Sequence, residues 1–154
     1  MFGHRALTGT LAAAALAVAS VLPSRGDERP ADPFKVHVDM KTFMEHVLTP
    51  AATIIWRVNG LMIDASGEHD LSPKTNEDWE QIVSGAATLA EASNALMIPE
   101  RRRDGEWVQY AAKLGAAAAK AYRGAEAHDL KAVSEVSDKL DGICAACHRH
   151  YGLE

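Results

Sequence analysis

The 154-residue sequence has few cysteines, few aromatic residues and no excess of basic charge. Its two cysteines exclude a disulfide-dense scaffold, and a formal net charge of −5 argues against a nucleic-acid-binding protein, which usually carries a basic excess. Beyond residue 25 no apolar run is long enough to span a bilayer. Aromatic residues make up 6% and alanine is abundant, so the composition favours helix over sheet.

The first 19 residues have the pattern of a secretory signal peptide. Arg5 gives a basic start, an apolar run covers 11–19, and residues 17–19 supply the small-x-small pattern of a signal-peptidase site. We expect cleavage after Ala19, with a cut near Gly26 as the alternative. An uncleaved membrane anchor is less favoured because the apolar core is short. The mature protein is then exported without stable membrane insertion, and 20–35 form a flexible segment ahead of the folded domain.

Four stretches in which apolar residues recur at intervals of three and four predict amphipathic helices. These stretches cover 36–60, 76–95, 106–127 and the sequence from 129 toward the C-terminus. Loop composition marks 64–76 and 97–105, and no stretch alternates as a strand would. The predicted fold is therefore all-α, with a single domain over 36–154 folded as an antiparallel four-helix bundle.

Two residues predict how these helices bend and begin. Pro50 lies inside the first helical pattern and lacks the N–H group that a helix needs, so it predicts a kink or a split. Asn76 has a side chain that can accept the free N–H groups of a helix start. It is therefore the predicted N-cap of the second helix.

The sequence Cys144-Ala145-Ala146-Cys147-His148 contains both cysteines and has the C-x-x-C-H pattern that attaches a c-type haem. On a helix, residues three and four apart lie on one face, so both thiols can form thioethers with the two vinyl groups of one porphyrin. His148 projects from the same side and can reach the iron as the proximal ligand. The motif therefore predicts one covalently bound haem c with its iron.

Three other uses of a C-x-x-C pair fit this sequence less well. A thioredoxin-like redox pair follows a strand and opens a helix, whereas this pair ends a helical sequence. A zinc site needs four ligands, and the sequence has neither a second cysteine pair nor a paired-histidine motif. A disulfide between two cysteines at this spacing in a helix has poor geometry.

With this motif close to the C-terminus of a helical chain that carries an export signal, the sequence resembles the class II c-type cytochromes, the group of cytochrome c′ and cytochrome c-556. Tyr151 matches the aromatic residue that often stands three positions after the histidine in this family. Gly152 departs from the basic residue that follows it, so the family's salt bridge is not implied here. The resemblance covers nearly all of the mature chain. It implies a cytochrome c′-like bundle in the periplasm that carries electrons between redox partner proteins and is not an enzyme.

In this family a residue of the first helix covers the distal side of the haem, and its identity decides the function. A methionine gives six-coordinate iron for electron transfer, and a bulky non-ligating residue gives five-coordinate iron that binds NO or CO. We expect Met44 to be the distal ligand because it lies deeper in the apolar stripe, with Met40 as the alternative. Two ordinary core methionines are a further alternative. His46 is a further candidate iron ligand, but it lies about 200° from Met44 around the helix and is expected to face solvent or the edge of the bundle.

The resemblance also implies a homodimer packed through the first two helices. Apolar residues on more than one side of the first helix support a partner surface, unless the kink turns them inward; they include Ile54, Ile55, Trp56 and Val58. The basic run Arg101, Arg102 and Arg103 could pair with haem propionates or with an acidic partner, although such a run more commonly lies in solvent. The three tryptophans are expected to be core anchors: Trp56, Trp79 and Trp107.

Overall fold

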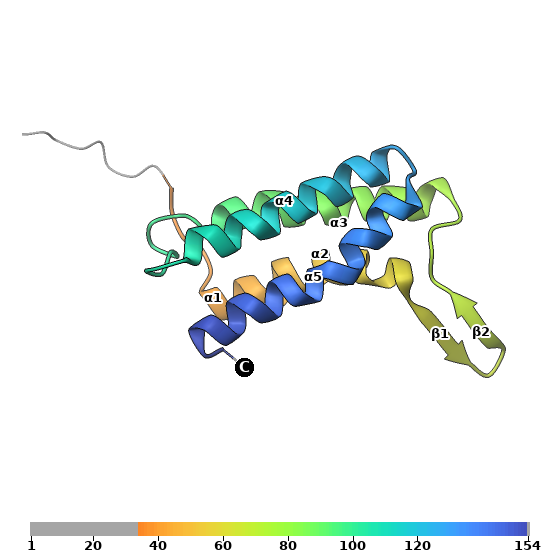
Figure 1. Cartoon of the computed structure of the whole chain (residues 1–154), viewed down its shortest axis with the longest axis horizontal. Helices are drawn as coiled ribbons and strands as arrows, with labels where there is room; N and C mark the ends of the chain where they lie inside the picture. The colour runs from red at the N-terminus through yellow and green to blue at the C-terminus, as the bar shows by residue number, and fades with distance from the viewer. Residues whose placement is uncertain (1–33, 154) are drawn as a thin grey trace, which may run out of the picture. The chain divides into compact units, whose positions relative to one another are not determined.

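Residues 34–153 are the part of the chain that the computed structural model describes, and they are mostly helical, as the composition predicts (Figure 1). They belong to one unit of the chain, Asp32–Glu154. The predicted signal peptide, its alternative cleavage site near Gly26 and nearly all of the segment 20–35 lie outside the described residues. No helix within 34–153 combines the length and the apolarity needed to cross a membrane.

The first helical stretch changes its hydrogen-bonding pattern along its length. It comprises α1 (Met40–Phe43), the π-helix η1 (Met44–Leu48), α2 (Thr49–Trp56) and the 3₁₀-helix η2 (Arg57–Asn59). The Asp39 carboxylate caps its start by accepting the Thr42 N–H at 2.9 Å. The helix therefore begins at Met40, four residues later than the apolar pattern predicts.

Pro50 explains the change of pattern in the middle of this stretch. Proline lacks an N–H and its ring crowds the carbonyl group four residues earlier, so regular α-helical bonding cannot pass through it. The π-turn just before Pro50 bonds over five residues instead, and the Thr49 N–H donates to the Met44 carbonyl oxygen. The helical stretch is not split at Pro50, as one of the two predicted forms would require, and its regular bonding is interrupted by this widened turn instead.

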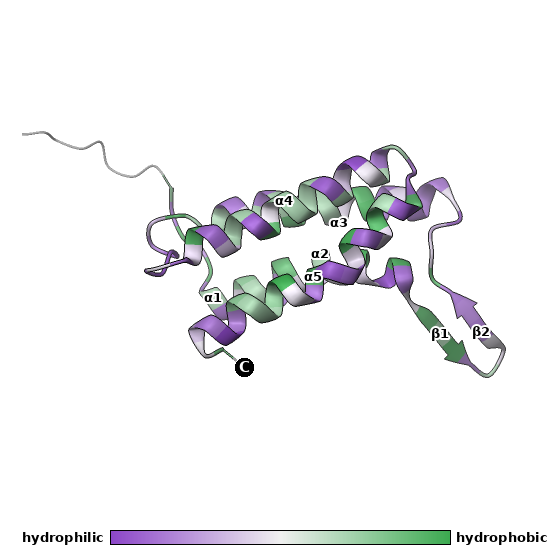
Figure 2. Cartoon of the chain, in the orientation of Figure 1, coloured by the Kyte–Doolittle hydropathy of each residue, from purple (hydrophilic) through white to green (hydrophobic). Residues whose placement is uncertain are grey.

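A β-hairpin follows, where the sequence predicts no strand and, from residue 64, a loop. Strands β1 (Leu61–Asp64) and β2 (Gly67–Asp70) pair antiparallel. In the turn between them, the Asp64 carboxylate accepts the Ser66 N–H at 2.7 Å, and Gly67 adopts a φ of +125° that a side chain would strain. All four residues of β1 are exposed although Figure 2 shows the strand as largely hydrophobic. Because neither face is buried, the sequence lacks the alternation by which strands are recognised.

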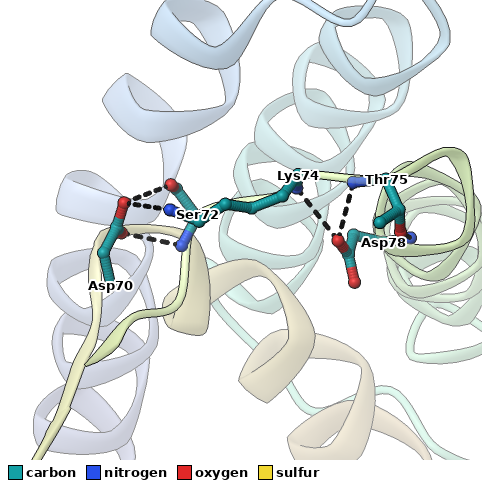
Figure 3. A network of polar contacts seen from close by, with 5 residues as sticks. All are labelled: Asp70, Ser72, Lys74, Thr75 and Asp78. Atoms are coloured by element: carbon teal, nitrogen blue, oxygen red, sulfur yellow. Dashed lines mark hydrogen bonds and ion pairs between the residues drawn. The ribbon is translucent and has the colours of Figure 1, made fainter. Parts of the chain in front are cut away.

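Three longer helices complete the described residues: α3 (Asn76–Ala95), α4 (Trp107–Glu126) and α5 (Leu130–Tyr151). Their bounds agree with the predicted ranges, but the N-cap of α3 is Thr75 and not Asn76. The Thr75 Oγ1 accepts the Asp78 N–H at 3.1 Å, and the Asp78 carboxylate accepts the Thr75 N–H at 2.8 Å (Figure 3). This reciprocal pair is a capping box, which satisfies two N–H groups and therefore outcompetes a lone asparagine.

The long helices pack against one another and against α2. Helix α3 contacts α4, α4 contacts α5, and α2 contacts both α3 and α5 (Figure 1). The largest fully buried side chains in the core are Ile55, Leu89, Trp107, Val133 and Leu140. A glycine permits a close approach of α2 to α3, because a Cβ at Gly85 would lie 2.9 Å from the Ile54 Cβ.

The apolar residues that suggested a partner surface on the first helix are covered within the chain. Ile55 and Val58 are buried, and Ile54 packs against the core. These side chains need no second copy to remove them from water. The homodimer therefore rests on the family resemblance and stays a prediction.

Candidate functional site

The last turns of α5 carry Cys144, Cys147 and His148, three and four residues apart. All three line one apolar cleft of about 720 Å³, a volume that includes space open to solvent. We call it the Cys–His cleft; its other walls are mostly aliphatic side chains of α2, α3 and α4, together with Met44, Trp56, Trp107 and Tyr110. Concave sites with mostly apolar walls are typical of bound cofactors.

Both thiols of the cleft are free and partly buried. Burial raises the pKa of the Cys144 thiol, and the carboxylate of Asp141 raises it further. Burial also raises the pKa of the Cys147 thiol, against the opposing effect of the Arg103 charge. Both thiols are therefore protonated at neutral pH, whereas the nucleophilic cysteine of a thioredoxin-like pair has a lowered pKa. This environment disfavours a catalytic redox pair.

The His148 imidazole lines the cleft without a competing partner. Its side chain forms no hydrogen bond or ion pair with the residues that the structure describes. His150, two residues further on, does not line the cleft and lies 3.8 Å from the Glu106 carboxylate. His46 is exposed, as its position on the helix predicts. Of these three histidines, His148 alone offers a ring nitrogen to a ligand in the cleft, which is the requirement for an iron ligand.

The two candidate methionines differ in position. Met44 lines the cleft, whereas Met40 packs against the core at the start of α1 and does not reach it. The structure therefore brings Met44 together with Cys144, Cys147 and His148 in one cleft. Distal ligation by Met44 stays a prediction, but Met44 is the methionine of this pair that faces the same space as the histidine.

Trp56 packs against the core, as expected, and it also lines the cleft. Its indole Nε1 is buried and has no hydrogen-bond partner among residues 34–153. Trp107, which also lines the cleft, donates from its Nε1 to the Leu96 carbonyl oxygen at 2.7 Å. The position of Trp56 in the cleft could have been predicted from the sequence, because four cleft residues recur at intervals of four along one helical stretch: Met44, Leu48, Ala52 and Trp56.

A cluster of aromatic rings supports the cleft near the end of α5. The Tyr151 ring meets the Trp107 ring edge-on, with 5.2 Å between centroids, and lies 6.3 Å from the Tyr110 ring. Trp107 and Tyr110 line the cleft, while Tyr151 does not. Tyr151 therefore packs behind two side chains of the wall and holds their positions.

None of the three consecutive arginines lines the cleft. The Arg101 guanidinium lies 4.0 Å from the centroid of the Phe43 ring and donates to the Val38 carbonyl oxygen at 3.1 Å. Arg102 and Arg103 are exposed. Arg101 therefore connects the loop after α3 to the segment before α1, and the run does not place a cation inside the cleft.

Within the described part of the chain, no three histidine, cysteine, aspartate or glutamate side chains are grouped to hold a metal ion. Comparisons of the chain with protein-family models, with curated proteins and with solved structures found no match. The function is therefore inferred from the cleft and the residues that line it.

Proposed function

We propose that the chain is an exported monohaem cytochrome of the class II c-type group, with α2, α3, α4 and α5 forming an antiparallel four-helix bundle around one haem. Its role is to carry single electrons between partner proteins in the periplasm, without catalysis of its own. The observation that supports this proposal is that Cys144, Cys147 and His148 line one apolar cleft together with Met44.

The residues of the cleft fit a covalently bound haem. The cleft has the apolar walls that a large planar cofactor requires. Two thiols three residues apart match the two vinyl groups of one porphyrin, and the His148 imidazole is available to its iron. The buried Trp56 N–H needs an acceptor that no described residue supplies, which is further evidence for a ligand with polar groups.

Cys144 and Cys147 are the residues that would hold the haem covalently. Each thiol would be joined to one vinyl group as a thioether, with the S–C bond at one vinyl carbon and the thiol hydrogen on the other. This addition needs no net oxidant or reductant. Both thiols have a raised pKa, so each carries the hydrogen that the addition transfers at neutral pH.

His148 would bind the iron on its proximal side and Met44 on its distal side. A bound haem supplies the reversible exchange of one electron at its iron. A Met44 thioether bound there would favour the ferrous state and raise the reduction potential. The aliphatic walls exclude water, and this burial is a second means by which the chain sets the potential.

The test is expression of the full chain in a host that exports it and attaches haem c. Mass spectrometry should show one covalent haem, and the double variant Cys144→Ser, Cys147→Ser should lose it. The reduced protein should give a sharp low-spin absorption spectrum. His148→Ala should change this spectrum, whereas His150→Ala, the matched control on the same helix, should leave it intact.

Two outcomes would contradict the proposal in different ways. A high-spin spectrum with ready binding of CO would indicate the alternative function, a five-coordinate cytochrome c′ that binds NO or CO. A purified chain without covalent haem would refute both functions.

A further inference from the structure

The unpartnered indole of Trp56 is the feature of the cleft that covalent attachment and iron ligation leave unexplained. An indole N–H is only a donor, so it can be satisfied only by an acceptor. Within 34–153 the buried Nε1 of Trp56 has no such acceptor. Trp107 shows that this fold can satisfy a buried indole with its own backbone, through the Leu96 carbonyl oxygen. The acceptor for Trp56 is therefore expected to arrive with the ligand.

The backbone fixes where Trp56 lies relative to the two thiols. The Ser137 hydroxyl donates to the Trp56 carbonyl oxygen at 3.3 Å, and the Asn59 amide donates to the Asp138 carboxylate at 2.7 Å. These bonds hold the end of α2 against the middle of α5. Ser137 precedes Cys144 by seven residues, which is about two helical turns, or roughly 10 Å along the axis.

The chemistry of a haem places its acceptors on the side away from the thiols. The two vinyl groups that bind cysteines lie on one edge of the porphyrin, and the two propionate carboxylates lie on the opposite edge. No lysine or arginine of the described residues lines the cleft, and the Arg103 charge, which acts on Cys147, lies at the thiol end of the cleft. A buried neutral N–H is then the group that can donate a hydrogen bond to the carboxylate, since hydrogen bonds to a charged acceptor are among the strongest.

We propose that Trp56 is a ligand-positioning residue whose indole N–H donates a hydrogen bond to a propionate carboxylate of the haem. This inference rests on the proposed function and extends it from the attachment and iron ligands to the acidic edge of the cofactor. Trp56 thereby fixes the far edge of a group that Cys144 and Cys147 hold at the near edge.

The test uses the full-length holoprotein and the variants Trp56→Phe and Trp107→Phe. Both substitutions remove one indole N–H from the cleft wall, but the bond lost at Trp107 goes to the Leu96 backbone. In reduced-minus-oxidised infrared difference spectra, Trp56→Phe should shift the carboxylate bands of the propionates, and Trp107→Phe should leave them in place. The midpoint potential of Trp56→Phe should also depend on pH differently from that of the parent.

A measurement on the unsubstituted holoprotein covers the case in which Trp56→Phe does not fold. Hydrogen exchange of the indole N–H groups, followed by NMR in the reduced state, should show Trp56 protected by about tenfold or more relative to an exposed indole. Trp107 is the internal reference. Rapid exchange at Trp56, or unshifted carboxylate bands in a folded Trp56→Phe holoprotein, would overturn the inference. A chain that binds no covalent haem would refute the proposed function instead.

Discussion

The hydroxyl of Tyr151 donates a hydrogen bond to the carbonyl oxygen of Asp104, with 2.7 Å between the two oxygens. The two residues are 47 positions apart in the sequence. The bond joins the last turn of α5, which carries Cys147 and His148, to the loop that leads into α4. The helix that carries the two thiols and the histidine is thereby tied to the start of α4 by a contact outside the cleft itself.

Tyr151→Phe should therefore loosen this end of the molecule while leaving its core packed. The ring stays against Trp107, and only the donor to Asp104 is lost. We expect a small fall in the urea midpoint and faster hydrogen exchange in the last turn of α5. Tyr122→Phe is the control, because Tyr122 is exposed at 37%. Equal effects of the two substitutions would show that the Asp104 bond does not stabilise the fold.

On the proposed function, Met44→Ala should change the spin state of the haem iron without releasing the haem, since attachment would depend on the two cysteines. Because Met44 lies in the cleft and is partly exposed, its truncation should cost about 2 kcal/mol of stability. The iron should become high-spin, the potential should fall and ferrous CO binding should become easier. Met40→Ala is the matched control and should leave the absorption spectrum nearly unchanged. If neither variant changes the spin state, methionine ligation is wrong.

Two Gly→Ala substitutions in helices should have opposite signs. At Gly85 the new Cβ would lie 2.9 Å from the Ile54 Cβ, so α2 and α3 must separate. We expect this to lower the free energy of unfolding by about 1–3 kcal/mol. At Gly142 no heavy atom lies within 4 Å, so alanine should stabilise α5 by about 0.5–1 kcal/mol. Chemical denaturation of both variants measures the difference. A stabilising Gly85→Ala would show that the two helices do not pack so closely.

Thr75→Ala should destabilise the protein by about 1 kcal/mol, because it removes the acceptor for the Asp78 N–H at the start of α3. Asn76→Ala should have little effect, since alanine is a good helix former and Asn76 is not the cap. Thermal unfolding of the pair distinguishes the two cap assignments. The reverse order of stabilities would restore Asn76 as the cap.

Acid should destabilise the start of α3. Hydrogen bonds from the backbone N–H groups of Lys74 and Thr75 hold the pKa of Asp78 below its ordinary value of 3.8, and the Lys74 ammonium lowers that of Asp70 (Figure 3). A carboxyl group whose pKa is lowered in the folded state stabilises the protein at pH values above its pKa in the unfolded state, which is about 4. This stability is lost as the pH falls through the pKa of the folded state. Between pH 7 and pH 3, urea unfolding should show that Asp78→Asn loses less free energy of unfolding than the parent protein does. Equal losses would contradict this assignment.

The periodic part of the fold could be predicted from the sequence, and the parts without a buried face could not. Helices α3, α4 and α5 each have an apolar stripe, and their predicted ranges agree closely with the structure. The β1–β2 hairpin has no buried face, and its stability depends on local turn chemistry at Asp64, Ser66 and Gly67. Pro50 predicts that the helix is interrupted, but whether the chain kinks or widens depends on what packs around it.

The part of the site that lies on one helix could also be predicted, because spacing fixes it. Cys144, Cys147 and His148 share a helix, and the structure brings them to one cleft. Trp56 is on another helix, 88 positions from Cys144, and its contribution depends on how α2 packs against α5. A tryptophan in an apolar stripe looks the same in sequence whether its N–H is satisfied or not.

The π-turn at Met44–Leu48 is equivalent to a single extra residue inserted into an α-helix. One residue corresponds to about 100° of rotation around the helix axis. Because the π-turn takes up the extra residue, deleting one residue between Met44 and Pro50 would leave an ordinary α-turn and keep Met44 in register with α2. Deleting one residue from the regular turn between Ala52 and Trp56 would instead rotate everything N-terminal to it by about 100° relative to Trp56, and Met44 would leave the cleft that Trp56 still faced. The place of this methionine is thus a matter of register as much as of residue type.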